Sequence, residues 1–501
     1  MQGATPELSP ALRAPIEEFE NFFASPSSGR ARSMAAPSAG SEQRRAWPSS
    51  SDVDPCADSA VALARRLARG DVDATEIVEG TLRRARREES LNAFITISET
   101  RLRDESRAAA ALVGVHSLAG VPLAHKDIIA TKDVRTTGGS DSRANAVPTT
   151  DAEIVRRFRV RGLPLVGKTN THELATGITG QVSAAGAVMN PWDTTRVTGG
   201  SSSGSAAAVA AGVVTLATAT DTGGSARIPA ACCGVVGFKP TYAAVPAHGV
   251  IPFSWTLDHV GLMARYSNDI SAAASCLGLR PTPARDRASL AGLRFALPEH
   301  LLAEADPAVA DLVGEVATRL EADGAHRVDP QWPSWFDHAD GIAASIFLSE
   351  GAAVHSDVLA DDAALLQPPT RALLRSADAI ATGSYTMALA GRQASIRAAN
   401  SFFSEVDVLL SPALPIGAPR IDQEMIALPE GTVDVRAALT RYTRLWNVTG
   451  NPVVCVPCGI AEGLPVGVQF IGPRHNDRGL LGVAGRYEQL RGRFPSAPAS
   501  G

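Results

Sequence analysis

A glycine- and serine-rich run that leads directly into an alanine-rich segment is the feature that most limits how this chain can fold. The run 199–205 is followed by 205–212, which is nearly all alanine, a strong helix former. Residues 213–220 then have the length and composition of a strand, and a second cluster, 221–225, comes after it. We therefore expect one serine cluster at the N-terminus of a helix and the other just past a strand.

Strand-length and helix-length segments alternate along much of the chain. Asp58 or Ser59, and then Asp73, are candidate caps for two helices that end near residues 69 and 87. The other elements expected from this pattern are strands at 93–97, 163–166, 453–457 and 466–471, and helices at 152–161 and 478–490. This alternation indicates an α/β layered fold.

Composition separates an N-terminal tail from one long folded domain. Residues 1–52 are rich in Ser, Pro, Ala and Gly without sustained periodicity, and such a segment cannot bury enough apolar surface to fold. We expect a disordered tail at 1–52 and a single domain over 53–495. Between about 281 and 435 the pattern loosens into Pro-rich connectors and helical stretches, which predicts loops and covering helices around a substrate pocket.

The composition also argues against several kinds of partner and compartment. The longest apolar-dominated run, 206–219, is shorter than the roughly 20 residues needed to cross a bilayer, so no membrane span is expected. The formal charge of -5 is too small, and too evenly spread, for a basic surface that binds nucleic acid. Six cysteines form no dense disulfide framework and follow no N-terminal signal pattern, which favours a reducing cytoplasm.

Lysine is rare in this chain and occurs only in one central block, at 126, 132, 168 and 239. All other basic residues except histidine are arginines. Arginine cannot lose its proton in a protein, whereas a buried lysine can, so a retained lysine is a candidate base. A genome that favours arginine codons would explain the same bias, and composition alone does not decide between the two explanations.

Three residues together predict a hydrolytic site. A hydroxyl nucleophile needs a base to take its proton, and a glycine-rich backbone can turn N–H groups toward a developing oxyanion. Lys126 provides the base, and Ser201 and Ser225 lie in the two glycine-containing clusters.

Other chemistries have weaker support in the residues. The run 200–204 is close to the G-x-S-x-G turn of α/β-hydrolases, but turn-forming residues rather than a strand precede it. The ten histidines show no metal-ligand spacing and no phosphate-binding glycine motif occurs, so neither a metal nor another cofactor is expected. A Ser-His-Asp esterase or hydrolase stays open, because the members of such a triad meet only in space.

Several runs of residues resemble the amidase signature family. They follow the order of that family from about residue 55 to 492, with the signature itself between 120 and 241. The matching runs are 120–127, 166–170, 190–193, 199–211, 220–230, 237–241 and 447–452. The resemblance implies an α/β fold with one large domain, in which a central mixed, mostly parallel β-sheet is covered by helices on both faces.

The resemblance also implies roles for the three candidate catalytic residues. Ser225 would be the nucleophile, Ser201 the bridging serine on a cis peptide bond, and Lys126 the base of a Ser-cis-Ser-Lys triad. The reference pKa of lysine is about 10.4, so a lysine base has to be desolvated and held neutral among hydroxyl groups. Ser201 would then relay the proton of Ser225 to Lys126 while an acyl-enzyme forms, and water would hydrolyse that intermediate.

Further positions are implied by the same resemblance. The N–H groups of the oxyanion hole would belong to Thr222, Gly223, Gly224 and Ser225. Ser202 would be the neighbour that hydrogen-bonds the lysine. Asp221 and Arg227 would form the supporting network.

One segment departs from the family pattern at positions that the resemblance places near the acyl pocket. The residues 181–187 begin with Gln181 and Val182 and include Ala185, where related sequences often carry a polar residue at the second position and an aromatic at the fifth. We expect a roomier, more apolar pocket from these exchanges, with simple packing variation as an equally open explanation.

The favoured function is a free-standing amidase that hydrolyses a carboxylic amide to an acid plus an amine or ammonia, on linear C–N bonds other than peptide bonds. The expected partner is a small-molecule amide, with no nucleic acid and no membrane. Two further classes stay open: the glutaminase (A) subunit of a tRNA-dependent amidotransferase, and a catalytically silent binding protein of the same fold. The sequence leaves the natural substrate and the oligomeric state open, a homodimer included.

Overall fold

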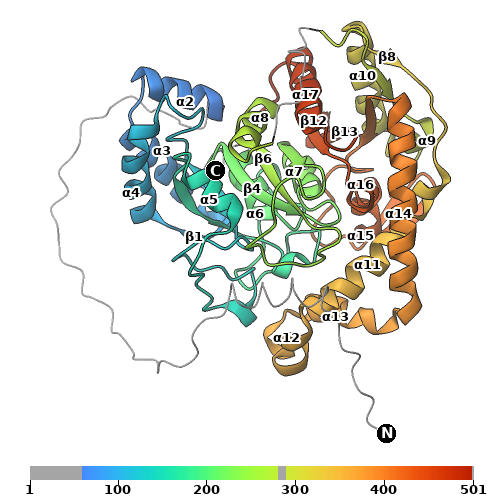
Figure 1. Ribbon diagram of the computed structural model, residues 1–501, viewed down its shortest axis with the longest axis horizontal. Helices are drawn as coiled ribbons and strands as arrows, with labels where there is room; N and C mark the ends of the chain where they lie inside the picture. Colours follow the sequence, from blue (N-terminus) through green and yellow to red (C-terminus); the bar gives the residue numbers. More distant parts are fainter. Residues whose placement is uncertain (1–58, 280–288, 499–501) are drawn as a thin grey trace, which may run out of the picture.

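One mixed sheet of eleven strands forms the centre of the molecule (Figure 1). The computed structural model describes residues 59–279 and 289–498, and the tail predicted at 1–52 lies outside the described residues. The strand order is β1-β3-β2-β4-β6-β5-β12-β13-β9-β7-β8. These strands are β1 (Phe94–Ile97), β2 (Leu123–Lys126), β3 (Leu165–Thr169), β4 (Leu216–Asp221), β5 (Val236–Lys239), β6 (His259–Ala264), β7 (Arg294–Ala296), β8 (His326–Arg327), β9 (Val408–Pro412), β12 (Val453–Ala461) and β13 (Leu464–Ile471). A separate hairpin pairs β10 (Met425–Leu428) with β11 (Gly431–Asp434).

Most neighbouring strands of the large sheet are antiparallel, so the expected predominance of parallel pairs is wrong. Parallel pairing joins β2 to β3 and β4, and β7 to β8 and β9. The other neighbours are antiparallel. The connection between β12 and β13 shows one reason: Glu462 and Gly463 both have positive φ, as in a two-residue hairpin turn, and such a turn joins only antiparallel strands.

The two faces of the sheet carry side chains of different size. On β4, Leu216 packs into one hydrophobic core, whereas Ala217 and Ala219 pack into the other, because alternate residues of a strand point to opposite faces. On the small-residue face, a Cβ added to Gly237 of β5 would lie 2.6 Å from the Cβ of Ala230. Small residues therefore let the helices on this face approach the sheet closely, and these helices carry the serine clusters.

Helices cover both faces of the sheet, as expected (Figure 1). The large-residue face packs against α8 (Ser267–Cys276), α10 (Pro307–Ala322) and α17 (Asp477–Arg491), and the small-residue face against α6 (Ser203–Ala210) and α7 (Arg227–Cys233). The other helices are α2 (Ala60–Arg69), α3 (Ala74–Arg87), α4 (Glu99–Ala109), α5 (Glu153–Arg159), α9 (Glu299–Ala303), α11 (Ala339–Val354), α12 (Ser356–Asp361), α13 (Pro368–Arg375), α14 (Thr382–Glu405), α15 (Val435–Thr440) and α16 (Arg444–Thr449). Short 3-10 helices occupy Glu89–Leu91, Ala110–Leu112, Asp141–Arg143, Glu173–Ala175, Ser334–His338, Ala363–Leu365 and Ser376–Ala379.

Local sequence signals set the ends of the elements that carry the candidate site. The Ser59 hydroxyl caps α2, and Asp73 forms a capping box with Glu76 at the start of α3, as predicted. The helix expected after the first serine cluster is α6, which begins at Ser203, and the strand expected before the second cluster is β4, which ends at Asp221. The two serine clusters therefore occupy the positions that the chain pattern predicts.

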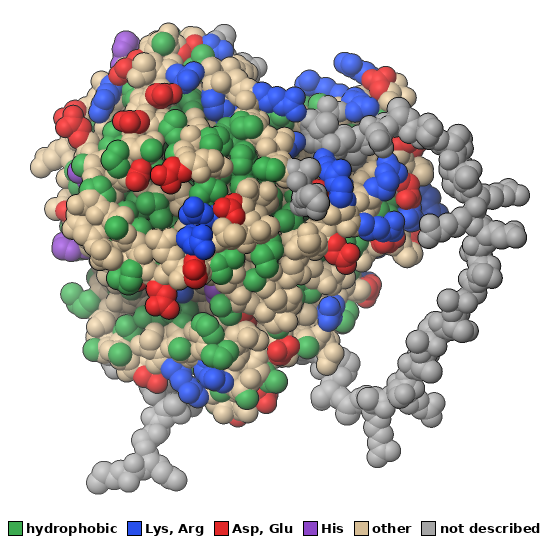
Figure 2. All heavy atoms as spheres, turned by 180° about the vertical axis from the view of Figure 1, so that it is seen from behind, with side chains coloured by type: hydrophobic (Ala, Val, Ile, Leu, Met, Phe, Trp, Pro, Cys, Tyr) green, Lys and Arg blue, Asp and Glu red, His purple; other side chains and the backbone are tan. Residues whose placement is uncertain are grey.

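Two features of the helices and of the surface bear on possible partners. Within 59–279 and 289–498, no helix is long and apolar enough to cross a membrane. Figure 2 shows acidic and basic side chains interspersed over the face that it presents, without one continuous basic stripe. The helices α11, α13, α14 and α16 lie together beside the sheet in Figure 1, and part of this group lines the candidate site described below.

Candidate active site

The candidate site lies where β2 and β4 end. These strands are parallel neighbours, so their carboxyl ends lie at the same edge of the sheet. Lys126 is the last residue of β2 and Asp221 the last of β4. Ser201 precedes the first residue of α6 by two positions, and Ser225 precedes that of α7 by two. Two strand ends and two helix starts therefore bring the candidate residues to one place.

Lys126 is a fully buried lysine whose partners are hydroxyl groups. Its Nζ lies 2.7 Å from Ser201 Oγ and 2.8 Å from Thr220 Oγ1. Among the described residues no carboxylate lies within ion-pair distance of this nitrogen. Burial lowers the pKa of Lys126 to about 7, although the charges of Asp221 and Asp258 act in the opposite direction. A substantial fraction of the amine is thus uncharged near neutral pH.

Ser201 and Ser202 connect this lysine to the second serine cluster. The peptide bond between Gly200 and Ser201 is cis. The Ser202 amide donates to the carbonyl oxygen of Ser225 at 3.2 Å, which joins the backbones of the two clusters. The Ser202 hydroxyl donates to the carbonyl oxygen of Thr220 at 3.2 Å and makes no hydrogen bond to Lys126. The lysine contact expected of Ser202 is therefore made by the side chain of Thr220 instead.

Ser225 lies at the boundary between the protein interior and a cavity. Only 6% of the residue is exposed, and it lines a cavity of about 180 Å³. Among the described residues, its hydroxyl makes no hydrogen bond to Ser201 or to another side chain. The structure thus brings Lys126 and Ser201 into direct contact and holds Ser225 beside them through its backbone.

The backbone of 222–225 presents unpaired N–H groups at this point. Gly224 has φ of +128°, and a Cβ there would lie 2.5 Å from Thr443 Oγ1, so the position requires glycine. The Gly224 N–H donates to Asp221 Oδ1 at 2.8 Å and is not available to another acceptor. The N–H groups of Thr222, Gly223 and Ser225 have no acceptor among the described residues. Of the four expected oxyanion donors, three are free in this structure.

Asp221 and Arg227 form a buried ion pair behind this loop. Arg227 donates to both carboxylate oxygens of Asp221, at 2.8 and 2.9 Å, and both residues are fully buried. Asn447 Nδ2 donates to Asp221 Oδ1 at 2.8 Å and to its carbonyl oxygen at 2.9 Å. Burial alone would raise the pKa of Asp221, but Arg227 holds it well below the usual range. The carboxylate therefore stays charged and fixes the Gly224 and Ala226 amides.

Two cavities meet at the candidate site and share Ala175 and Thr222 in their linings. The smaller one contains Ser225 and is walled mainly by apolar residues, among them Ile178, Phe347 and Leu373. The larger one has a volume of about 430 Å³ and contains Thr220, the partner of Lys126. The substrate-sized space is therefore divided by the end of β4 and the residues after it.

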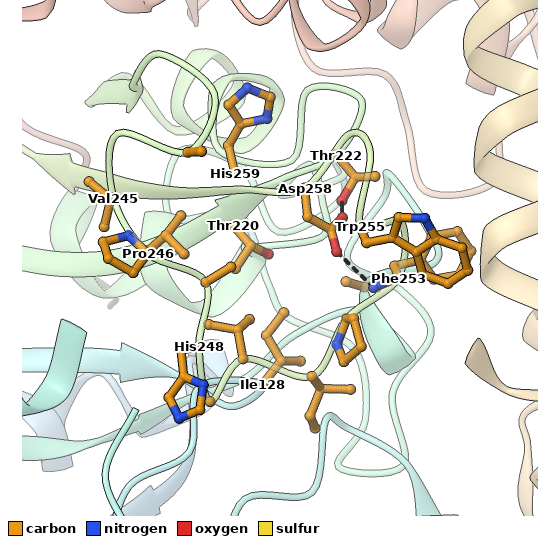
Figure 3. Close-up of a pocket in the computed structure, with 18 of the residues that line it drawn as sticks. Ile128, Thr220, Thr222, Val245, Pro246, His248, Phe253, Trp255, Asp258 and His259 are labelled. Atoms are coloured by element: carbon orange, nitrogen blue, oxygen red, sulfur yellow. Dashed lines mark hydrogen bonds between the residues drawn. The ribbon is translucent and has the colours of Figure 1, made fainter. Parts of the chain in front are cut away.

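A half-buried carboxylate, Asp258, lines the larger cavity (Figure 3). Figure 3 shows the Thr222 hydroxyl directed toward Asp258, to which it donates at 2.6 Å. The Phe253 and Ser254 amides donate to the other carboxylate oxygen at 2.8 and 3.0 Å. Burial raises the pKa of Asp258 to about 6 despite these donors. Thr220 points into the same space in Figure 3, and the negative charge of Asp258 acts on the pKa of Lys126.

The segment expected to shape the acyl pocket is held by hydrogen bonds to two other parts of the chain. Gln181, Val182 and Ala185 line neither of the two cavities. The Val182 carbonyl oxygen accepts from Glu173 N at 2.8 Å, and the Ala185 carbonyl oxygen accepts from Asn92 Nδ2 at 2.8 Å, with Ala185 exposed. Val182 and Ala185 are thus tied by hydrogen bonds to neighbouring segments, and the wider, more apolar acyl pocket expected from these exchanges stays a prediction.

Among the described residues, the site has neither a histidine placed as a base for the serines nor a cluster of metal ligands. His125, His172 and His259 are buried, and burial lowers the pKa of each, to about 3 for His125 and His172. None of the three hydrogen-bonds Ser225. Within the described ranges, no cluster of His, Cys, Asp and Glu could hold a metal ion. Among the described residues, no histidine therefore makes the hydrogen bond to a serine hydroxyl that the Ser-His-Asp alternative requires.

Some site residues were not predicted from the sequence. Thr220 could have been found, because Thr218 and Thr220 alternate along β4 and share the face that meets Lys126. Asp258, Arg436 and Arg444 also line the two cavities, but they lie far along the chain from the serine clusters and form no motif with them. Only the folded chain brings these three residues to the site.

Comparison with known proteins identifies the family. The pattern of the Amidase family matches residues 76–481. The chain is 35% identical over 476 residues to the A subunit of glutamyl-tRNA(Gln) amidotransferase from Thioalkalivibrio sulfidiphilus (strain HL-EbGR7), covering 85% of this chain and 96% of that relative. A crystal structure of an amidase matches with a TM-score of 0.80 at 30% identity, covering 87% of this chain and 100% of the other. The substrate complex of 6-aminohexanoate cyclic dimer hydrolase matches with a TM-score of 0.78 at 27% identity, covering 87% and 97%.

The sequence and fold comparisons agree with each other and with the resemblance drawn from the residue runs. The family pattern spans most of the chain, and the relatives are matched over nearly their whole length. This chain therefore belongs to the amidase signature family.

Proposed function

We propose that the protein is an amide hydrolase in which Ser225 is the nucleophile, Ser201 the proton relay and Lys126 the base. The observation that carries this proposal is the contact of 2.7 Å between Lys126 Nζ and Ser201 Oγ in a fully buried setting, where no described carboxylate pairs with the amine. A lysine in such surroundings is able to accept a proton near neutral pH, because burial disfavours its charged form.

The reaction starts with attack of Ser225 Oγ on the amide carbonyl carbon. Its proton passes to Ser201, whose own proton passes to Lys126, so the lysine becomes an ammonium. The oxyanion of the tetrahedral intermediate lies within reach of the free N–H groups of Thr222, Gly223 and Ser225. The fixed carboxylate of Asp221 holds the loop that presents these donors.

Collapse of the intermediate breaks the carbon–nitrogen bond and returns the proton through Ser201 to the leaving nitrogen. An amine or ammonia departs, and an acyl ester on Ser225 remains. Water then attacks this ester while one of its protons passes through Ser201 to Lys126, and collapse returns this proton through Ser201 to Ser225 Oγ as the carboxylic acid leaves. The Ser225 hydroxyl has to approach Ser201 for this sequence, and catalytic hydrogen bonds of this kind often form only when substrate is bound.

The most direct test uses a fluorophosphonate probe, which reacts with an activated serine hydroxyl. We expect labelling of the wild type and none of Ser225→Ala, with Ser203→Ala as matched control because Ser203 Oγ is buried and has no hydrogen-bond partner among the described residues. Ser201→Ala should keep more activity than Ser225→Ala only if water can replace the relay. Unlabelled wild type would instead indicate a catalytically silent binding protein.

A free-standing amidase and an amidotransferase component are two forms of this proposal, and different observations favour them. The relative described above and others of similar identity carry the name of the A subunit of glutamyl-tRNA(Gln) amidotransferase, which favours a glutaminase with partner chains. The lining of the Ser225 cavity favours the free-standing enzyme. No acidic residue of the described chain lines this cavity, so the α-ammonium group of glutamine would lack a counter-charge there.

Ammonia release separates these two forms. We expect the purified protein alone to hydrolyse small carboxylic amides faster than it releases ammonia from glutamine. Efficient hydrolysis of glutamine, with little activity on amides that lack the ammonium group, would support the amidotransferase form and contradict the free-standing one. The prediction that no nucleic acid binds is tested in the same preparation by adding tRNA, which should leave the rate of amide hydrolysis unchanged.

A further inference from the structure

Two arginines line the cavity that contains Ser225. Arg436 belongs to α15 and Arg444 is the first residue of α16. The stem of Arg444 lies beside the loop of free N–H groups, since its Cγ is 3.8 Å from the Cβ position of Gly223. Positive charge is therefore placed next to the site of attack, in a cavity that no described acidic residue lines.

Arg436 has no ion-pair partner within the described ranges, and the carboxylate that pairs with Arg444 is largely exposed. Arg436 is half-buried and donates to the carbonyl oxygen of Thr176 at 3.1 Å, and it makes no ion pair among the described residues. Arg444 lies 3.6 Å from Asp340, whose side chain is 63% exposed, so solvent weakens this pair. Burial and the charge of Arg444 lower the pKa of Arg436 to about 10. Two like charges in a partly dry cavity are unfavourable unless an anion joins them.

The size and walls of the cavity limit the group that could enter. Its volume of about 180 Å³ is close to the roughly 150 Å³ of a cavity that holds benzene, so a chain of a few carbon atoms fits. Ile178, Phe347, Leu348 and Leu373 line the space together with the two arginines. Apolar walls suit methylene groups, and the guanidinium groups suit a carboxylate.

We propose that the substrate is a short amide whose acyl chain ends in a carboxylate, and that Arg436 and Arg444 bind this carboxylate while Ser225 attacks the amide. The chemical class is the monoamide of a small dicarboxylic acid, such as glutaramate. This proposal rests on the function proposed above, since it names the substrate class of the same site. It also distinguishes glutaramate from glutamine, which differs from it only by an α-ammonium group.

The kinetic test compares three amides of equal chain length: glutaramate, pentanamide, which lacks the carboxylate, and glutamine, which adds an ammonium group. We expect kcat/KM for glutaramate to exceed that for pentanamide by about 10- to 100-fold, the range for charge-assisted hydrogen bonds, and to exceed that for glutamine. The preference should fall as salt is added. Equal or faster hydrolysis of pentanamide would overturn the proposal.

The variants Arg436→Gln and Arg444→Gln test which side chains cause the preference. Each should lower the ratio of kcat/KM for glutaramate over pentanamide by about tenfold, and Arg436→Lys should restore part of it. Arg441→Gln is the matched control, because Arg441 lies between them in sequence but pairs with Glu304 and lines a different cavity. A ratio that falls as much in Arg441→Gln as in the other two would also contradict the assignment.

A binding measurement keeps this test separate from catalysis. Calorimetric titration of Ser225→Ala with glutaramate should show binding that Arg436→Gln in the same background weakens by about tenfold, whether or not the wild type turns this amide over. Binding without turnover in the wild type would count against the proposed hydrolysis and leave the carboxylate site supported. Binding no tighter than that of pentanamide would overturn the carboxylate site itself.

Discussion

Lys126 and Lys168 occupy neighbouring parallel strands and are equally buried, yet the structure gives them different partners. Lys126 ends β2, and Lys168 lies next to it in β3, in register with His125. Both side chains are fully buried, and burial lowers the pKa of Lys126 to about 7 and that of Lys168 to about 8. Burial and a lowered pKa therefore do not by themselves identify a catalytic base.

The partners of the two amines make the difference. Lys168 Nζ lies 3.4 Å from Asp127 Oδ1, 2.7 Å from the Ile129 carbonyl oxygen and 2.6 Å from Thr136 Oγ1. The Asp127 carboxylate and the Ile129 carbonyl oxygen carry no proton to exchange, and the Thr136 hydroxyl donates its own proton to the carbonyl oxygen of Val134 at 3.1 Å. Lys126 contacts hydroxyl groups, and one of them belongs to Ser201, which can give up its proton and take another. Under the proposed mechanism, the partner with an exchangeable proton next to the nucleophile is what would make Lys126, and not Lys168, the base.

The largest expected effect is on the activity of Lys126→Met. Without an amine, the relay from Ser201 has no proton acceptor, so we expect kcat to fall by about 10³-fold or more. Lys168→Met should retain far more activity per folded molecule, because Lys168 has no contact with either serine. The measurement is kcat on an amide substrate, normalised to the fraction of folded protein. Equal losses in the two variants would remove the distinction between the two lysines.

The second expected effect is on stability, where Lys168→Met should cause a larger loss than Lys126→Met. Lys168→Met removes the ammonium that lies 3.4 Å from the buried Asp127 Oδ1, which has no hydrogen-bond donor among the described residues, and leaves Arg143 as a cation that acts on this carboxylate. We expect the free energy of unfolding to fall by about 3–5 kcal/mol, as for other broken buried ion pairs. Lys126→Met removes a buried amine and strands no carboxylate, so its Tm should be unchanged or higher. Denaturant titration of both variants measures this difference.

The third prediction concerns pH. Lys126 must be uncharged to accept a proton, and its pKa is about 7. Below that pH the protonated fraction grows, so kcat/KM should fall about tenfold per pH unit as pH decreases, and it should level off above about pH 8. A profile that stays flat down to pH 5 would exclude Lys126 as the base. The same pH profile for Ser201→Ala shows whether the fall in kcat/KM at low pH comes from protonation of the lysine or from the Ser201 relay.

Sequence reasoning located the candidate catalytic residues because they lie in continuous runs. The alanine-rich helix, the strand before Asp221 and the caps at Ser59 and Asp73 follow from local propensity, and the structure confirms these elements. The direction of strand pairing does not follow from local propensity. It depends on turns such as Glu462 and Gly463 and on crossovers, so the sheet was wrongly expected to be mostly parallel.

Pocket residues were the least predictable part of the site. Arg436, Arg444 and Asp258 reach the cavities only through the packing of helices and loops that are distant in sequence. The segment with Val182 and Ala185 was assigned to the pocket by resemblance, and this assignment stays a prediction, since neither residue lines the two cavities described above. Motifs thus predicted the groups proposed to perform the reaction, and only coordinates show the groups that would choose the substrate.

A smaller effect is expected for Thr220→Val, which removes the second hydroxyl partner of Lys126 at nearly constant volume. We expect kcat/KM to fall by about tenfold because the amine loses an orienting contact. The acid limb of the pH profile should also move to lower pH, since a hydrogen bond donated by the amine favours its charged form. Thr218→Val is the matched control, because the Thr218 hydroxyl contacts the backbone amide of Lys126 and not its amine. The same loss and shift in Thr218→Val would contradict a specific role for Thr220.

The smallest effect is expected for Asp258→Asn, which tests how far the surroundings of Lys126 adjust its pKa. The negative charge of Asp258 raises the pKa of Lys126 and opposes the effect of burial. Removing this charge should therefore move the acid limb of kcat/KM to lower pH, by less than about one pH unit. Asp269→Asn is the matched control, because burial raises the pKa of Asp269 to about 6 as well, but this group does not act on Lys126. An equal shift of the low-pH fall in kcat/KM in both variants, or a shift to higher pH in Asp258→Asn, would show that the charge of Asp258 does not raise the pKa of Lys126.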